Sequence, residues 1–173
     1  MTEHTKTPFP SCNFIYFGYT REIDRVVFLF LKLGVSVMPM KCIVVTPEKT
    51  VLSQEVTFAV LPLVDGEWGV MPNHAPLIGR LGTGELRLTG TDGQQTYYYV
   101  EGGFAEIYDN TISLLTMCSH PAHELNLEEA ETELAELPSP MEDMQLAASR
   151  QSKIDRYRAK VRVARKAAER TGK

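Results

Sequence analysis

Cysteine is scarce in this sequence, and its placement argues against two kinds of small-protein scaffold. The three cysteines are Cys12, Cys42 and Cys118, an odd number with no C-x-x-C pair among them. Such a set suits neither a disulfide framework nor a zinc cage, and it fits a reducing compartment. Hydrophobic residues make up 43% of the chain and charged residues 23%, so we expect a globular protein that folds around a core without disulfides.

Basic residues are absent from the middle of the chain. No Lys or Arg occurs between Leu88 and Ser149, whereas ten follow from Arg150 to the end, against only Asp155 and Glu169. This last segment therefore has a formal charge of +8, although the whole chain has a net charge of −4. Such a split predicts an acidic partner for the tail, either within the chain or on another molecule.

Long apolar runs are also missing. The stretch from Val26 to Met38 is interrupted by Lys32 and Gly34, and as a helix it would be about 20 Å long, too short for a hydrocarbon core of about 30 Å. A signal or transit peptide fits poorly, because acidic residues precede the run and no small-residue cleavage site follows it. We therefore expect residues 1–39 to be an extension, either disordered or upstream of a true start at Met38 or Met40.

Catalytic and phosphate-binding constellations are not visible. His74 lies in a short turn between two prolines, with no Ser or Cys nucleophile and supporting carboxylate beside it, so an interface role is favoured over a catalytic base. The pairs Gly66-x-x-Gly69 and Gly82-x-Gly84 lack the strand-to-helix context and the lysine of a phosphate loop. We predict a protein that is not an enzyme and that needs no cofactor.

A metal site is similarly disfavoured. Cys118, His120 and His123 fall close together, but no second cluster completes a tetrahedral set of ligands. The segment is predicted to be a linker.

Short β-rich runs alternate with turn residues from Cys42 to Thr116. In the run from Glu55 to Leu61, Val56, Phe58 and Val60 are predicted to share one face, and Tyr98 is predicted to point inward between two outward neighbours. This spacing, without helix signals, indicates a β-sandwich or barrel over residues 40–122. The predicted strands are Ile43–Thr46, Thr50–Leu52, Glu55–Leu61, Gly69–Met71, Leu77–Leu81, Glu85–Thr89, Thr96–Glu101, Phe104–Tyr108 and Thr111–Thr116. Structural turn roles are predicted for Gly66, Gly69, Gly84, Gly102 and Gly103.

The hydrophobic period then changes to that of helices, over residues 123–173. Leu127, Ala130, Leu134 and Leu137 form one stripe, with Asn126 as the N-cap. Ser139-Pro140 is expected to restart a helix of about 30 residues, whose stripe is Ile154, Tyr157, Val161, Ala164 and Ala168. The two helices are predicted to pair as an antiparallel hairpin, with the acidic flank of the first near the basic flank of the second. Its apolar seam is thin, so this hairpin should be the least stable part of the molecule.

Four ordered segments resemble the epsilon subunit family of F-type ATP synthases. Asp65–Leu77 (DGEWGVMPNHAPL) is similar to the family signature G-E-x-G-I-x-P-G-H-A-P-L. Lys41–Leu52 resembles the opening strand and turn, and Leu81–Gly84 and Val100–Ile107 match two further segments. The resemblance begins at Met40 or Lys41 and runs to the end, leaving the first 39 residues uncovered. It also supports a late start, since family members begin just ahead of the first strand.

This resemblance implies a fold and a function. The fold is an N-terminal β-sandwich followed by a C-terminal two-helix antiparallel hairpin. The function is that of a non-catalytic rotor subunit whose sandwich binds the gamma subunit and the c-subunit ring, coupling proton flow to ATP synthesis. The helices either fold on the sandwich or extend toward the alpha and beta subunits and inhibit ATP hydrolysis. The implied location is the cytoplasmic face of the bacterial membrane, peripheral to it through the complex.

The resemblance also implies site residues. Glu67 and His74 match family positions near the contacts with the c-ring and gamma subunit, and Asn73 and Pro76 lie in the same turn. The cations expected to meet the acidic surface of the catalytic subunits are Arg156, Arg158, Arg162, Arg165 and Lys166.

Two departures from the family pattern carry expectations. Asn73 stands where the family usually has Gly, and both residue types tolerate a left-handed turn. Glu131 and Thr132 stand where some bacterial members have the Arg-Ala of an ATP-binding motif. A carboxylate would repel phosphates, so we predict no ATP binding by this motif.

The basic tail leaves one alternative open. Considered alone, it suits a stand-alone β-sandwich module with a helical tail that binds nucleic acid or anionic lipid. Stoichiometric gamma subunit in a co-purification favours the synthase interpretation, whereas bound nucleic acid favours the alternative.

Overall fold

The structure, a computed structural model, describes residues 38–136 and 144–172. In chain order, its elements are β1 (Met40–Val45), β2 (Thr50–Leu63), β3 (Gly66–Val70), β4 (Leu77–Gly90), β5 (Gln95–Tyr108), β6 (Thr111–Leu115), β7 (Ser119–Pro121), the 3-10 turn η1 (Ala122–Glu124), α2 (Leu127–Ala135) and α3 (Met144–Thr171). The predictions for residues 1–37 and for the Ser139-Pro140 restart lie outside the described residues.

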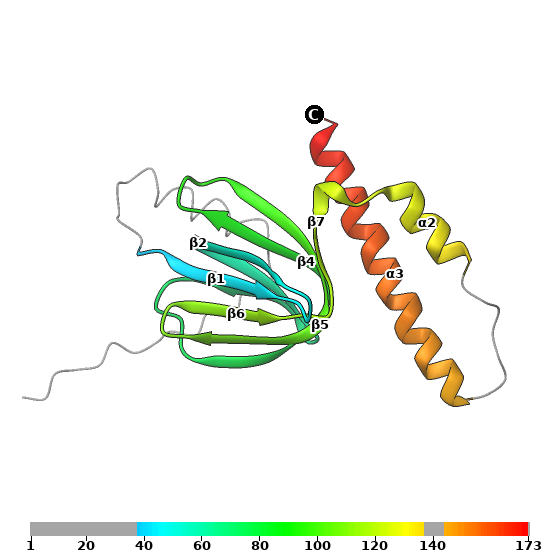
Figure 1. Cartoon of the computed structure of the whole chain (residues 1–173), viewed down its shortest axis with the longest axis horizontal. Helices are drawn as coiled ribbons and strands as arrows, with labels where there is room; N and C mark the ends of the chain where they lie inside the picture. The colour runs from blue at the N-terminus through cyan, green and yellow to red at the C-terminus, as the bar shows by residue number, and fades with distance from the viewer. Residues whose placement is uncertain (1–37, 137–143, 173) are drawn as a thin grey trace, which may run out of the picture. The chain divides into compact units, whose positions relative to one another are not determined.

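The strands form a β-sandwich that closes on itself, as predicted, and two helices follow it (Figure 1). The strand order is β1-β6-β5-β4-β2-β3, with β7 added alongside β5. β1 pairs with β6 in parallel and with the first part of β2 in antiparallel orientation, so β1 closes the sheet against β2. β3 extends beyond β2 and is an edge strand.

Several predicted short strands are merged in the structure. β2, β4 and β5 are each 14 residues long and each replaces two predicted strands. The pairing of β4 with β5 runs in one register from Leu77↔Ile107 to Thr89↔Gln95. The pairing therefore continues past the glycines within these strands, including Gly102 and Gly103, instead of ending at them.

The strict alternation predicted along β2 is wrong at its centre. A register shift between Val56 and Phe58 places Val56 on the same side as Ala59 and Leu61, in the main core. Such a bulge inserts one extra residue and reverses the face of everything that follows it. The alternation cannot reveal this, since every residue from Val56 to Leu61 is apolar or Thr.

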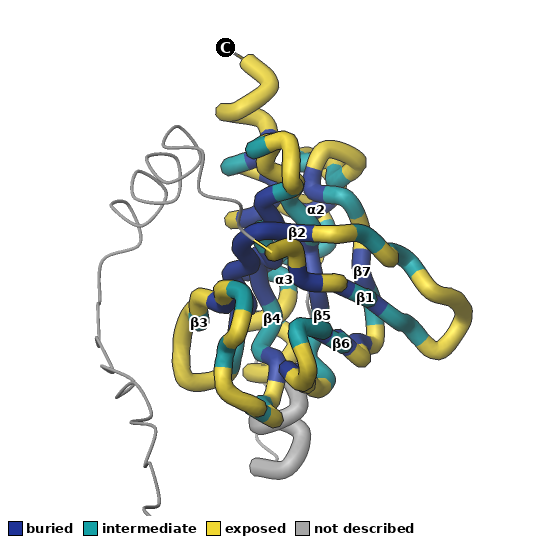
Figure 2. Tube along the Cα trace, turned by 90° about the vertical axis from the view of Figure 1, so that its left-hand side faces the viewer, coloured by how far each residue is buried: buried dark blue, intermediate teal, exposed yellow. Residues whose placement is uncertain are grey.

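The main core lies between the layers of the sandwich and is built from the inward-facing residues of its strands. It contains Met40, Cys42, Val44, Val56, Ala59, Leu61, Val70, Leu81, Leu86, Leu88, Val100, Ala105, Ile107, Ile112 and Leu114. Tyr98 packs against this core, as its predicted inward position requires. Buried positions concentrate in the middle of the strands and exposed ones at the turns (Figure 2).

The segment predicted as a plain linker is partly ordered. Ser119–Pro121 forms β7, whose residues pair with Tyr98, Tyr99 and Val100 of β5. η1 follows directly and leads into α2. A three-residue strand that contains histidine and proline has too little pattern to be recognised from the sequence, so tertiary pairing alone defines it.

The helices confirm the predicted cap and the predicted pairing. The Asn126 side chain accepts a hydrogen bond from the Glu128 backbone N–H at 3.0 Å and donates one to Glu129. α2 lies along α3 (Figure 1), and Lys160 and Arg165 of α3 contact Glu133 and Glu131 of α2.

A second apolar stripe on α3 was not predicted. Val163 and Ala167 join Tyr99 and Ala122 in a separate small core between the helix and the sandwich, whereas Ala168 of the predicted stripe is exposed. One helix thus contacts two different neighbours.

Candidate functional site

Glu67 lies on the edge strand β3 and is held by an arginine from inside the sheet. Its Oε2 atom is 2.6 Å from Nη2 of Arg87, which belongs to β4. The side chain of Glu67 is 37% exposed, compared with 21% for that of Arg87. The carboxylate is therefore oriented by the protein and still reachable from outside.

His74 is fixed in one neutral form by its two neighbours. Its Nδ1 lies 2.7 Å from the carbonyl oxygen of Ala75, and its Nε2 lies 3.3 Å from the indole nitrogen of Trp68. A carbonyl only accepts and an indole N–H only donates, so Nδ1 carries the proton and Nε2 accepts. The imidazole thus joins the turn to β3 through the indole of Trp68.

The turn is also tied to the neighbouring β5–β6 turn. Asn73 has a φ of +62°, the left-handed conformation expected at a position where the family usually has Gly. Its backbone N–H donates to Oδ1 of Asn110 at 2.6 Å. Pro76 is exposed and immediately precedes β4. The four predicted contact residues thus lie on β3 or in the turn that leads from it into β4, and hydrogen bonds hold Glu67, Asn73 and His74 there.

The five predicted turn glycines divide into two groups. Gly66, Gly102 and Gly103 have positive φ angles, although the last two lie within β5. At Gly103 a Cβ would come within 1.9 Å of the Leu115 carbonyl oxygen, so no other residue fits there. Gly69 and Gly84 are not turn residues, since they lie inside β3 and β4 and face Phe58 and Pro62 across the sheet.

A buried carboxylate anchors the C-terminal helix to the sandwich. Glu85 of β4 has a side chain only 4% exposed, and its two oxygens accept from Arg170 of α3 at 2.9 and 3.2 Å. Lys166, one turn earlier on α3, lies 3.8 Å from the same carboxylate. Desolvation lowers the pKa of Arg170, but its hydrogen bond with Glu85 and the attraction of that charge outweigh this, so the pKa is raised overall. The pair is bidentate, the stronger form of such a contact.

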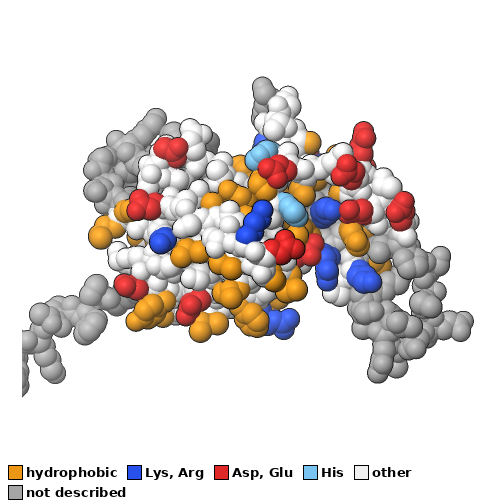
Figure 3. All heavy atoms as spheres, viewed as in Figure 1, with side chains coloured by type: hydrophobic (Ala, Val, Ile, Leu, Met, Phe, Trp, Pro, Cys, Tyr) orange, Lys and Arg blue, Asp and Glu red, His pale blue; other side chains and the backbone are white. Residues whose placement is uncertain are grey.

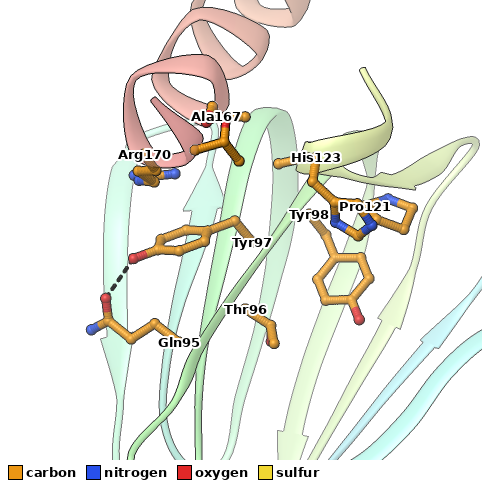
Figure 4. Close-up of a pocket in the computed structure, with 10 residues that line it drawn as sticks. Gln95, Thr96, Tyr97, Tyr98, Pro121, His123, Ala167 and Arg170 are labelled. Atoms are coloured by element: carbon orange, nitrogen blue, oxygen red, sulfur yellow. Dashed lines mark hydrogen bonds between the residues drawn. The ribbon is translucent and has the colours of Figure 1, made fainter. Parts of the chain in front are cut away.

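Two tyrosines of β5 complete the docking surface. The guanidinium of Arg170 stacks over the ring of Tyr97 at 3.6 Å (Figure 4), and Tyr99 is buried in the small core under α3. Burial, followed by the charge of Glu101, raises the pKa of Tyr99 well above its usual range. A cavity of about 230 Å³ opens beside Tyr97 and Arg170, and it is lined mainly by apolar surface.

The predicted regulatory cations behave in two ways in this docked arrangement. Arg156, Arg165 and Lys166 each lie within 4.0 Å of a carboxylate, on Glu101, Glu131 and Glu85 respectively. Arg158 and Arg162 are exposed, and neither forms an ion pair with another described residue. On the face in Figure 3, acidic side chains of α2 lie beside basic ones of α3.

The Cys118 segment holds a thiol–imidazole contact. Sγ of Cys118 lies 3.1 Å from Nε2 of His120, while His123 is exposed and lines the cavity. Within the described part of the chain, no group of three metal-ligating side chains comes together. Burial is the main cause that raises the pKa of Cys118, so the contact does not activate the thiol.

Sequence reasoning missed Glu85 and Tyr97 and did not single out Arg170. Glu85 lies in no recognised motif, and a single charged residue in a predicted strand usually contacts solvent. The available signal was the spacing of Val163, Lys166, Ala167 and Arg170, which falls on one face of a helix.

The fold and these contacts define a two-part interaction protein, a β-sandwich with exposed turn residues and a docked helical hairpin. Residues 39–119 match the family model for the ATP synthase delta/epsilon chain β-sandwich domain. The ATP synthase epsilon chain of Rhodopirellula baltica is 41% identical over 129 residues, which cover 74% of this chain and all of that protein. The chain belongs to the ATP synthase epsilon chain family.

Two solved structures share the fold. A chain of the Euglena gracilis mitochondrial ATP synthase superposes with a TM-score of 0.63 at 19% identity, covering 91% of this chain and 96% of its own length. A chain of the Tetrahymena thermophila mitochondrial enzyme, in a structure of its central stalk and c-ring, gives 0.52 at 15% identity, covering 72% and 98%. None of the described helices is long and apolar enough to cross a membrane.

Proposed function

We propose that this chain is a non-catalytic rotor subunit of an F-type ATP synthase. In this role it links the gamma subunit to the c-ring and so helps to couple proton flow to ATP synthesis. The main support is family membership, since the match extends over the whole of the Rhodopirellula protein. The presence of both the sandwich and the hairpin supports the same role.

The edge that carries Glu67, Asn73, His74 and Pro76 is proposed as the contact with the c-ring and gamma subunit. A partner that rotates with the chain must be gripped by a rigid surface, and hydrogen bonds hold this edge at Glu67, Asn73 and His74. Preorganised polar groups lower the entropic cost of such an interface.

The division of labour follows the two parts of the molecule. Residues 40–122 are proposed to assemble with the rotor, and residues 123–173 to regulate by reaching the alpha and beta subunits. Docking pairs Arg156, Arg165 and Lys166 within the chain, so undocking would free them to meet an acidic surface beside Arg158 and Arg162. The proposed location is the cytoplasmic face of the bacterial membrane.

The alternative of a nucleic-acid- or lipid-binding tail is not favoured. Five of the cations in α3 lie within 4.0 Å of a carboxylate of the same chain, which lowers the positive charge that the tail presents. The acidic partner that the charge split predicts is thus found inside the molecule.

A pull-down of the tagged chain from native membranes tests this function. We expect stoichiometric gamma subunit and c subunits, and reduced recovery with His74→Ala. His120→Ala is the matched control, because this histidine lies on β7 and outside the proposed edge. Recovery of nucleic acid without gamma subunit would sink the proposal.

A further inference from the structure

Four charged side chains form a continuous series from the edge strand to the C-terminal helix. Glu67 of β3 contacts Arg87 at 2.6 Å, and the other nitrogen of Arg87, Nη1, lies 4.0 Å from Oε1 of Glu85. Glu85 in turn accepts from Arg170 of α3. One arginine therefore stands between the exposed edge and the residue that anchors the helix.

The charge balance of this series depends on Glu67. Glu85 is the one carboxylate shared by Arg87, Lys166 and Arg170. While Glu67 pairs with Arg87, the carboxylates of Glu67 and Glu85 together face these three cations. Without Glu67, three cations would compete for a single carboxylate whose side chain is 4% exposed, where charges are screened poorly.

The competition has a specific target, Oε1 of Glu85. This oxygen accepts from Nη2 of Arg170 at 3.2 Å and is the nearest oxygen to Lys166. An Arg87 side chain released from Glu67 is free to close its 4.0 Å separation from the same oxygen. Its approach would weaken the hold on both cations of α3.

Apart from Glu85, α3 is held on the sandwich by a small core, by Arg156, which lies 3.6 Å from Glu101 of β5, and by the stacking of Arg170 on Tyr97. The core between α3 and the sandwich consists of Tyr99, Ala122, Val163 and Ala167, with Tyr97 and Leu125 packed beside them. The main core has fifteen buried residues. Undocking of α3 therefore requires much less free energy than unfolding of the strands.

We propose that Arg87 makes the docking of α3 depend on whether Glu67 is available to it. A partner that takes up Glu67 with a cation of its own thereby shifts α3 toward release. The identity of the partner rests on the proposed function, in which Glu67 is an interface residue. The coupling itself does not, because Glu67, Arg87, Glu85 and Arg170 all belong to this chain.

Amide hydrogen exchange of the full-length chain, followed by mass spectrometry, tests the coupling. Peptides from the second half of α3 report undocking, and peptides from β1 and β6 report the sandwich. Glu67→Gln is expected to speed exchange in α3 about two- to fivefold, as a partly exposed ion pair allows, and to leave β1 and β6 unchanged. Replacing Arg87 by Met or by Gln should abolish this effect of Glu67→Gln.

Asp65→Asn is the matched control. It removes one negative charge two residues from Glu67, and Asp65 forms no ion pair with another described residue, so exchange in α3 should not change. Two Arg87 variants are used in case one of them destabilises the sandwich. The variant whose β1 and β6 peptides exchange at the wild-type rate is the one used to judge the coupling.

The outcomes separate this coupling from the proposed function. If Glu67→Gln leaves exchange in α3 unchanged, or changes it equally with and without Arg87, the coupling is wrong. If the same variant nevertheless loses the gamma subunit or the c-ring in a pull-down, the proposed function stands without it. If Glu67→Gln speeds exchange in α3 only when Arg87 is present, and assembly is normal, the coupling is supported. The same result counts against Glu67 as an interface residue.

Discussion

Cys42 combines a titratable group with complete burial in the main core of the sandwich. Its side chain lies at 0% exposure, and burial raises the pKa of the thiol from 9.0 to about 12. The folded protein therefore keeps the proton at a pH at which the unfolded chain has lost it. This part of the stability is fully present below about pH 9 and is lost as the pH rises through the folded value.

We predict that the free energy of unfolding falls by roughly 1.4 kcal/mol per pH unit above pH 9 through this thiol alone. Urea unfolding between pH 8 and 10 measures this fall in the free energy of unfolding. The range stops at 10.0, the ordinary pKa of tyrosine, so that ionisation of the tyrosines contributes little. Cys42→Ala should remove most of the dependence of the unfolding free energy on pH, and it should also lower stability somewhat. Cys118→Ala should remove less of this pH dependence. Equal slopes in all three proteins would show that Cys42 ionises freely in the folded state.

Gly103 is a position in β5 at which the sheet accepts no side chain. The backbone there has a φ of +112°, and a Cβ would overlap the backbone of β6. The sequence marks the position as a turn because two glycines adjoin. The structure shows instead that the glycine allows β5 to continue while β6 passes unusually close to it.

At the scale of elements, α3 is anchored by its last turns. Arg170 makes a bidentate contact with Glu85 and stacks on Tyr97, whereas Arg158 forms no ion pair with another described residue. The two arginines therefore have different roles in docking, although both belong to the same basic tail.

Arg170→Met is expected to weaken docking of α3 by about 1–2 kcal/mol, because charge-assisted hydrogen bonds are lost and Glu85 keeps fewer partners. Limited trypsin digestion should then cut α3 faster, as cleavage follows the undocked population. Arg158→Met is the control and should change the rate little. If both variants are cut equally fast, the anchor does not lie at Glu85.

Elements that the sequence could identify were those with an unbroken local pattern. The Asn126 cap is confirmed because it depends on neighbours in the chain. The β2 bulge and β7 were missed, since a run of apolar residues does not show where its facing changes and a three-residue strand has no period. The face of α3 that docks on the sandwich was missed because its partners are distant in the sequence; Glu85, for example, lies 85 residues from Arg170.

At the scale of the whole molecule, the main core lies entirely within the strands. Every member from Met40 to Leu114 belongs to β1–β6, and the helices contribute only to the small second core. The sandwich should therefore fold and assemble without the hairpin.

A chain ending at Glu124 is predicted to keep the urea midpoint of the main transition and to recover gamma subunit as the full chain does. It should also relieve any inhibition of ATP hydrolysis that the hairpin exerts in the assembled enzyme. Hydrolysis assays of complexes with either form measure this, and pull-downs report assembly. Loss of assembly on truncation would show that the two parts do not divide the work in this way.

The sequence by itself determined the class of fold and the family, because these rest on local periodicity and on contiguous motifs. Tertiary structure alone decided which face of α3 meets the sandwich and which carboxylate receives its cations. Glu85, Arg87 and Arg170 look like solvated charges when considered singly. They become an anchor only when folding brings them together on a surface from which most water is removed.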